Sequence, residues 1–182
     1  MSGIFLTPSR PFYQSVIPME LKPIEYSKYE EFCFSNFRKG DKDLDTKVVS
    51  IVYQRYEGIT MYMQSLMNIM YNMTPAGGRC TEDMVDNALE TLLSYQSSIY
   101  ETILSLMPEK QRRLFLAIAQ EGKAKNISSG QFVRKYRLVS PSSVLSAIKG
   151  LMDKDFITKS NDTYYVYDLF FVEWLRKSEF IN

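Results

Sequence analysis

After Pro108 the chain has the feature that most restricts its possible folds: helical apolar spacing repeats in short segments and then changes to two strand-like runs. The expected elements, in order, are helices over 109–120, 128–136 and 141–152, strands over 156–159 and 164–167, and a closing helix around 170–175. A polar turn, Ser160 to Asp162, joins the two strands. Three helices followed by a hairpin are typical of a winged-helix domain, which we predict for residues 107–182.

The third of these helices would be the one that DNA-binding winged helices place in the major groove. Its apolar positions are expected to face inward: Val144, Leu145, Ile148, Leu151 and Met152. Its outward positions would then be Ser142, Ser143, Ser146, Lys149 and Asp153.

The helical spacing of apolar residues over 25–106 predicts a helical bundle. Ser27 with Glu30 suggests a capping box for a first helix that ends at Gly40, and Thr81 would cap a long last helix that reaches Leu106. Two helices lie between them, over 44–56 and 59–72. The second of these is rich in Met, which is consistent with core packing or with an adaptable peptide-binding face. In the long helix the residues expected to face inward are Met84, Ala88, Leu92, Tyr95, Ile99 and Ile103. The fold class is therefore mainly α, with a small β-hairpin wing.

The first 24 residues have a different character. Pro8, Pro11, Pro18 and Pro23 prevent a long helix, and the alternation from Met19 to Lys22 is that of a short strand. A single strand has no sheet of its own, so we expect this segment to be a remnant of a larger domain or a docking arm.

Charge is unevenly distributed. Residues 109–160 carry 11 Lys and Arg against 4 Asp and Glu, a balance of +7, whereas residues 1–108 have a balance of −4. A basic block suggests a surface that faces a polyanion. The alternative is a solvated basic face that meets an acidic partner.

Several kinds of chemistry find little support. The chain has no histidine, which excludes a Ser–His triad and removes the commonest metal ligand. Cys33 and Cys80 follow no metal or redox spacing and are expected to be buried thiols of a reducing compartment. Asp41, Asp43 and Asp45 resemble the start of a calcium loop, but the required glycine and the glutamate at the twelfth position are absent. With no signal peptide and no long apolar segment, the sequence predicts a cytoplasmic protein, without a metal site.

Seven stretches resemble the C-terminal part of the archaeal-type AAA ATPases, P-loop enzymes related to the STAND class. They are RPFYQS (10–15), MELKPI (19–24), YEEFCFSNF (29–37), YEGITMYMQ (56–64), PEKQRRLFLAIAQEG (108–122), SPSSVLSAIKGLMDKDFI (140–157) and YYVYDLFFVEWLR (164–176). The resemblance covers nearly the whole chain. It implies that residues 1–24 are the end of a nucleotide-binding core, that 25–106 are a helical lid and that 107–182 are the winged helix.

The same resemblance implies nucleotide-facing roles for Arg10, Gly58 and Thr60, with ATP and Mg²⁺ as the cofactors of an intact member. Here Gly58-Ile59-Thr60 replaces the Gly-x-Pro often found in the family. No G-x-x-x-x-G-K-[ST] motif occurs, so the chain lacks a phosphate-binding loop. We therefore expect no ATP hydrolysis by the chain alone and no catalytic residues. It would be a fragment of a longer protein or a degenerate relative.

Three functional hypotheses follow. The first is weak, mainly electrostatic DNA binding through Arg134, Lys135, Arg137, Ser142, Ser143, Ser146, Lys149 and, on the wing, Lys159. The second is a protein-interaction or autoinhibitory module that docks on an NTPase core or an effector, and self-association is compatible with it. The third is that the chain is the tail of an intact ATP-hydrolysing enzyme.

Overall fold

The computed structural model describes residues 22–178 together with Phe180 and Ile181. The described elements are α2 (Tyr26–Lys39), β1 (Asp43–Leu44), α3 (Thr46–Tyr56), α4 (Thr60–Met73), β2 (Arg79–Cys80), α5 (Met84–Leu106), α6 (Glu109–Glu121), β3 (Ala124–Lys125), α7 (Gly130–Lys135), α8 (Pro141–Asp153), β4 (Ile157–Ser160), β5 (Thr163–Val166) and α9 (Leu169–Lys177). The predicted class, mainly α with a small β-hairpin, is confirmed. Arg10 and the expected strand residues Met19 to Leu21 lie outside the described residues.

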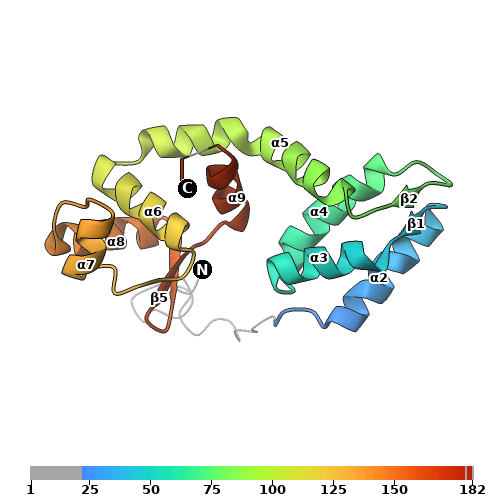
Figure 1. Ribbon diagram of the computed structural model, residues 1–182, viewed down its shortest axis with the longest axis horizontal. Helices are drawn as coiled ribbons and strands as arrows, with labels where there is room; N and C mark the ends of the chain where they lie inside the picture. The colour runs from blue at the N-terminus through green and yellow to red at the C-terminus, as the bar shows by residue number, and fades with distance from the viewer. Residues whose placement is uncertain (1–21, 179, 182) are drawn as a thin grey trace, which may run out of the picture.

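The first bundle consists of α2, α3 and α4 with the N-terminal half of α5 (Figure 1). Three valines of α3 and the methionines Met63, Met67 and Met70 of α4 are almost fully buried. The Met-rich helix is therefore part of the core, as the first of the two interpretations predicted. Burial of these side chains supplies the hydrophobic driving force that holds the bundle together.

Two predicted helix starts are wrong. α2 begins at Tyr26 after Glu25, whose side chain makes no capping hydrogen bond, while the Ser27 hydroxyl only bonds to the Glu25 carboxylate at 2.8 Å. Tyr26, the first residue of the helix, packs its ring edge-to-face on Tyr53 at 5.1 Å. α5 begins at Met84, and the Thr81 hydroxyl donates to the Asp83 carboxylate instead of capping the helix.

A two-residue parallel pair, β1 with β2, joins the loops at the far end of this bundle. Arg79 on β2 lies 3.5 Å from Asp43 and 3.4 Å from Asp45, so two of the three aspartates that resemble a calcium loop pair with a guanidinium. Asp45 also accepts from the Lys47 amide and caps α3. Two-residue strands have no readable periodicity, which is why the sequence did not predict them.

The second unit has α6, α7 and α8 on one side and the antiparallel sheet β3-β5-β4 on the other. Ser129 caps α7 through the Phe132 amide at 3.2 Å, and Ser140 caps α8 through the Ser143 amide at 3.2 Å. Pro141 stands in the first turn of α8, where a missing N–H costs nothing. β3, the third strand, pairs with the predicted hairpin and was not predicted, because it too has only two residues.

Helix α9 lies beneath α5 and joins the two units (Figure 1). Phe170 packs edge-to-face on Tyr62 of α4 at 4.8 Å, and Phe171 stacks on Tyr100 of α5 at 4.3 Å. The Tyr62 hydroxyl donates to the Tyr167 carbonyl at 3.2 Å and accepts from the Leu169 amide at 3.1 Å. These ring contacts and backbone hydrogen bonds fix α9 against both α4 and α5.

Some apolar residues expected to face inward are exposed. Tyr95 and Ile99 on α5, and Leu145 and Met152 on α8, have 74%, 58%, 60% and 40% of their surface accessible. Each helix is covered on one side only, because α5 extends past α4 and the core beneath α8 is filled by Val144, Ala147, Ile148 and Leu151. Helical spacing identifies apolar positions but not which of them a neighbour covers.

The two thiols are deeply buried, as predicted from their isolated positions. Cys33 is 3% exposed and Cys80 fully enclosed, and both are free. Loss of solvent on burial raises the pKa of the Cys33 thiol to about 11 and also raises the pKa of Cys80. The folded state therefore holds the Cys33 proton more tightly than the unfolded chain. This contribution to stability is complete below the unfolded pKa of ~8.5 and is lost as the pH rises from there toward 11.

We expect both thiols to resist a disulfide reagent at pH 8 in the native protein and to react fully after denaturation, because a buried protonated thiol is a poor nucleophile. Ellman titration of native and urea-unfolded protein measures this directly. A Ser35→Cys variant, which places a thiol at an exposed position of α2, is the matched control and should add one fast-reacting group. Rapid reaction of native wild-type protein would contradict the buried placement.

Candidate nucleic-acid interface

The outward face of α8 contains most of the predicted contact residues. Ser142, Ser146 and Lys149 are exposed, and Ser143 is half-buried. The Ser142 hydroxyl lies 3.1 Å from that of Ser140, and the Ser143 amide bonds to the cap, so both serines at the helix start are held locally. Ser146 and Lys149, one turn further along, project outward from the middle of the helix.

Two arginines stand just before α8. Arg134 lies near the end of α7, and Arg137 lies in the turn with a left-handed backbone, φ 50°. Both are exposed, and neither they nor Lys149 forms an ion pair within the described part of the chain. These three cations are therefore available for an external anion.

Lys135 and Lys159 differ from these cations. The Lys135 ammonium lies 2.5 Å from the Glu121 carboxylate and above the Tyr136 ring, and Lys159 lies 3.4 Å from Asp162 across the wing turn. The hydrogen bond to Glu121 raises the pKa of Lys135. The carboxylate beside each lysine cancels much of its charge, so both lysines contribute less to a local positive potential than Arg134, Arg137 and Lys149.

Two acidic side chains near this surface, Glu109 and Glu121, are paired with cations. Glu109 accepts hydrogen bonds from Arg113 at 2.6 Å and from Arg112, which lower the pKa of its carboxyl group. Bonds from Lys135 and from the Tyr136 hydroxyl at 2.6 Å likewise lower the pKa of Glu121. These pairs leave the balance of +7 over 109–160 unchanged, because each also uses a cation, and Asp153 at the end of α8 is exposed and forms no ion pair within the described residues.

An apolar group that the sequence did not predict lies in the same surface. Val139 is 63% exposed, and Leu145 and Met152 follow it on the outward face of α8. A small hollow between Lys110, Arg113 and Ser143 borders Val139. The sequence could have indicated the exposure of Leu145, because it stands next to Ser146, which was expected to face outward. Leu145 was instead expected to face the core. Val139, Leu145 and Met152 therefore add exposed apolar side chains to a region that also carries exposed cations.

Gly58 and Thr60, the two described residues implied to face nucleotide, differ in exposure: Gly58 is buried and Thr60 is exposed. Gly58 is buried with φ 77°, and its carbonyl accepts from the Ile24 amide at 3.3 Å. A Cβ there would come within 2.9 Å of Pro23, so glycine is required by the turn. Thr60, at the start of α4, is exposed. Gly58 and Thr60 are both placed by the turn that leads into α4, and their nucleotide-facing role stays a prediction.

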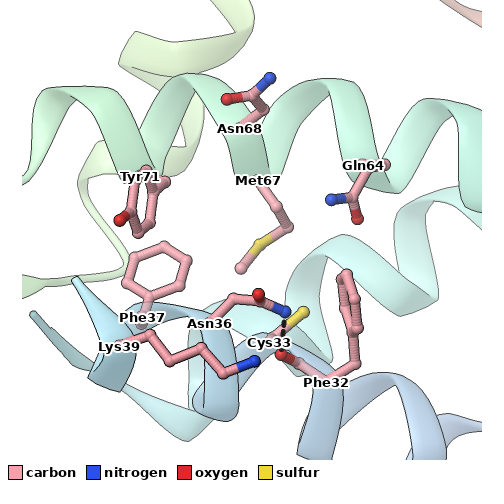
Figure 2. A pocket seen from close by; sticks show the side chains of 9 residues that line it. All are labelled: Phe32, Cys33, Asn36, Phe37, Lys39, Gln64, Met67, Asn68 and Tyr71. Carbon is pink, nitrogen blue, oxygen red and sulfur yellow. Dashed lines mark hydrogen bonds between the residues drawn. The ribbon is translucent and has the colours of Figure 1, made fainter.

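A hollow of about 360 Å³ lies between α2 and α4. Figure 2 shows Phe32, Asn36 and Lys39 of α2 facing Gln64, Asn68 and Tyr71 of α4 across it. The Asn36 amide donates to the Phe32 carbonyl at 2.8 Å. The lining residues include amides and one lysine but no carboxylate, so they offer no pair for acid–base chemistry.

No three His, Cys, Asp or Glu side chains in the described part of the chain converge on a point that could hold a metal ion. None of its helices is long and apolar enough to cross a membrane.

Comparison with known proteins agrees with the topology. Three helices, a three-stranded sheet with a hairpin wing, and the outward helix α8 are in place, and residues 98–177 match the family described as a probable winged helix domain. The C-terminal unit is a winged helix.

The whole chain also resembles a solved structure, the Walker-type ATPase of Pyrococcus abyssi, with a TM-score of 0.64 and 17% sequence identity. The likeness covers 94% of this chain and 47% of that ATPase, so the chain spans about half the length of the protein it resembles. No curated protein matches the sequence significantly.

Proposed function

We propose that this chain is the lid and winged-helix portion of a Walker-type ATPase of the archaeal AAA and STAND-like group, and that its winged helix binds duplex DNA. The portion is non-catalytic by itself, since it carries no phosphate-binding loop; ATP and Mg²⁺ would be bound by a nucleotide-binding core. The fold likeness to the Pyrococcus abyssi ATPase supports the first part of the proposal.

One observation carries the DNA-binding part: Lys149, Arg134 and Arg137 are exposed around α8 while Glu109 and Glu121 nearby are paired. Cations without a local partner exchange bound counterions for phosphates, which is the main source of affinity in non-specific DNA binding. Ser146 supplies a hydroxyl for phosphate or a base edge, and Leu145 an apolar contact of the kind made with a thymine methyl group. The absence of Asn, Gln and Arg from the outward positions of α8 predicts weak sequence preference.

A second function is favoured by a separate observation. Val139, Leu145 and Met152 are 63%, 60% and 40% exposed on or beside α8. Exposed apolar side chains among polar and charged ones are typical of protein interfaces. The second candidate is therefore docking of α8 on a protein, either the ATPase core or an effector.

Fluorescence anisotropy with a labelled mixed-sequence duplex, measured across a salt series, tests the DNA hypothesis. We expect the affinity to fall steeply as salt rises. The double variant Arg137→Glu, Lys149→Glu should bind at least about 10-fold more weakly at low salt and show a shallower salt slope, because two phosphate contacts become repulsive.

A matched control is Lys28→Glu, Lys47→Glu, which makes the same charge change at exposed positions of the first bundle. Equal weakening by both double variants would show that only net charge matters and would contradict an interface on α8. If Leu145→Ser leaves DNA binding unchanged but abolishes binding to a separately produced ATPase core, the docking function is supported instead.

A further inference from the structure

The hollow between α2 and α4 has the size and the place of a small-molecule site. Its volume of about 360 Å³ lies within the range of ligand pockets, which often form between the helices of a bundle. The inner faces of both helices belong to the core of the first bundle, so the hollow is formed before any ligand binds. It lies outside the winged helix and has no part in DNA binding by α8.

The floor and the two ends of the hollow favour a ligand with an aromatic ring. Cys33 and Met67 are 3% and 2% exposed, and Figure 2 shows their sulfur atoms in the middle of the hollow. Phe32 stands at one end, while Phe37 and Tyr71, edge-to-face at 5.2 Å, stand at the other. Sulfur atoms and aromatic side chains both make favourable contacts with a ring. The rings at both ends also limit the length of a ligand, so a compact planar molecule suits this space better than an extended chain.

The hydrogen-bonding groups favour an anionic head on that ring. Lys39 and Gln64 are exposed, and neither side chain forms a hydrogen bond or ion pair within the described part of the chain. Asn36 already donates to the Phe32 carbonyl at 2.8 Å. The lining contains no carboxylate, so the Lys39 ammonium is its only charge. An ammonium and a side-chain amide N–H together are suitable donors to a carboxylate.

Other classes of ligand suit this lining less well. A metal ion or an organic cation needs acidic side chains, and none lines the hollow. A free phosphate or a nucleotide is usually held by the N-terminus of a helix or by several cations, whereas this hollow lies between the sides of two helices and has one ammonium. The lining therefore fits a single negative charge on an apolar body.

We propose that the hollow between α2 and α4 binds a small aromatic carboxylate. The ring lies over Met67, between Phe32 and Tyr71, and the carboxylate accepts hydrogen bonds from Lys39 and Gln64. Lys39 has a flexible stem and an exposed ammonium, so it can reach the carboxylate after the ring has entered. The proposal concerns the first bundle alone and stands or falls independently of DNA binding.

Indoleacetate and indoleacetamide are suitable probes, because they share one ring system and differ in the charge of the head group. Two-dimensional amide NMR of the full chain at pH 7 measures their binding and locates it. We expect indoleacetate to bind with a Kd of roughly 1 mM or below, as is usual for a ligand of this size, and to shift the signals of residues 32–39 and 64–71. Indoleacetamide should bind about 10-fold more weakly, because it lacks the charge that Lys39 meets.

Two variants separate the head group from the ring. Lys39→Gln should bring the ratio of the two dissociation constants from about 10 to near 1 and leave indoleacetamide binding unchanged. Lys28→Gln neutralises an exposed lysine of the same helix outside the hollow, and this matched control should keep the full ratio. Phe32→Ala removes the ring at one end and should weaken both probes equally.

Three results would overturn the proposal: no binding of indoleacetate up to ~10 mM, equal affinity of wild-type protein for the two probes, or an unchanged ratio in Lys39→Gln. A short peptide that ends in phenylalanine presents a ring and a carboxylate on a chain terminus. We expect it to bind more weakly than indoleacetate, because the ends of the hollow leave no path for a chain. Tighter binding of the peptide would overturn the assignment to a free small molecule.

Discussion

Replacing Phe171 with Ala is expected to lower the free energy of unfolding by about 3–5 kcal/mol, the usual cost of removing a buried aromatic ring. Phe171 is 3% exposed and lies between Tyr100 at 4.3 Å, Phe115 at 5.0 Å and Trp174 at 5.9 Å. These rings come from α5, α6 and α9, so the cavity would open where three helices meet. For a chain of this size the melting temperature should fall by roughly 10 °C.

Thermal unfolding followed by circular dichroism measures the change. Phe32→Ala is the matched control, since Phe32 on α2 is 47% exposed and its removal opens no enclosed cavity. We expect less than about 1 kcal/mol for it. A Phe171→Ala protein as stable as the control would show that α9 is not packed as described.

Replacing Tyr62 with Ala is expected to cost a similar amount, about 3–5 kcal/mol, for a different reason. Tyr62 is 4% exposed and packs on Phe170 at 4.8 Å and Tyr56 at 5.6 Å. Its hydroxyl also bonds to the backbone at Tyr167 and Leu169. The change therefore removes both the ring contacts and the polar link between α4 and α9.

Tyr62→Phe separates the two contributions. It keeps the ring but leaves the Leu169 amide without this acceptor, so we expect a loss of about 1–2 kcal/mol. Chemical unfolding should show whether the bundle and the winged helix still unfold together. If Tyr62→Ala splits the transition in two, α9 couples the units; if one transition persists with wild-type stability, the contact between α4 and α9 contributes nothing.

Both of these residues lie at a junction that the sequence could not indicate. Phe170 and Phe171 were expected to be apolar positions of a closing helix, and they are. That Asp168 caps this helix and also accepts from the Tyr100 hydroxyl at 2.9 Å depends on residues 68 positions apart. Local patterns carry no information about such pairs.

At the candidate site, too, local features were predicted from the sequence and contacts between distant residues were not. The sequence predicted which helix faces outward and placed cations before it, because caps, turns and helical spacing are local. The pairing of Lys135 with Glu121, 14 residues away, appears only after α6 and α7 have packed together. Exposure of Leu145 was missed for a related reason: its neighbours on α8 already fill the space above the core.

By itself the sequence determined the order of the helices and of the wing hairpin, and with it the winged-helix pattern after Pro108. These follow from periodicity and from the cost of leaving apolar faces in water. Tertiary structure alone decided that the Met-rich helix is buried and which apolar side chains remain uncovered, among them Tyr95 and Ile99 on α5 and Leu145 on α8. A helix has a fixed apolar stripe, but how much of it is buried depends on how far each neighbouring helix extends along it.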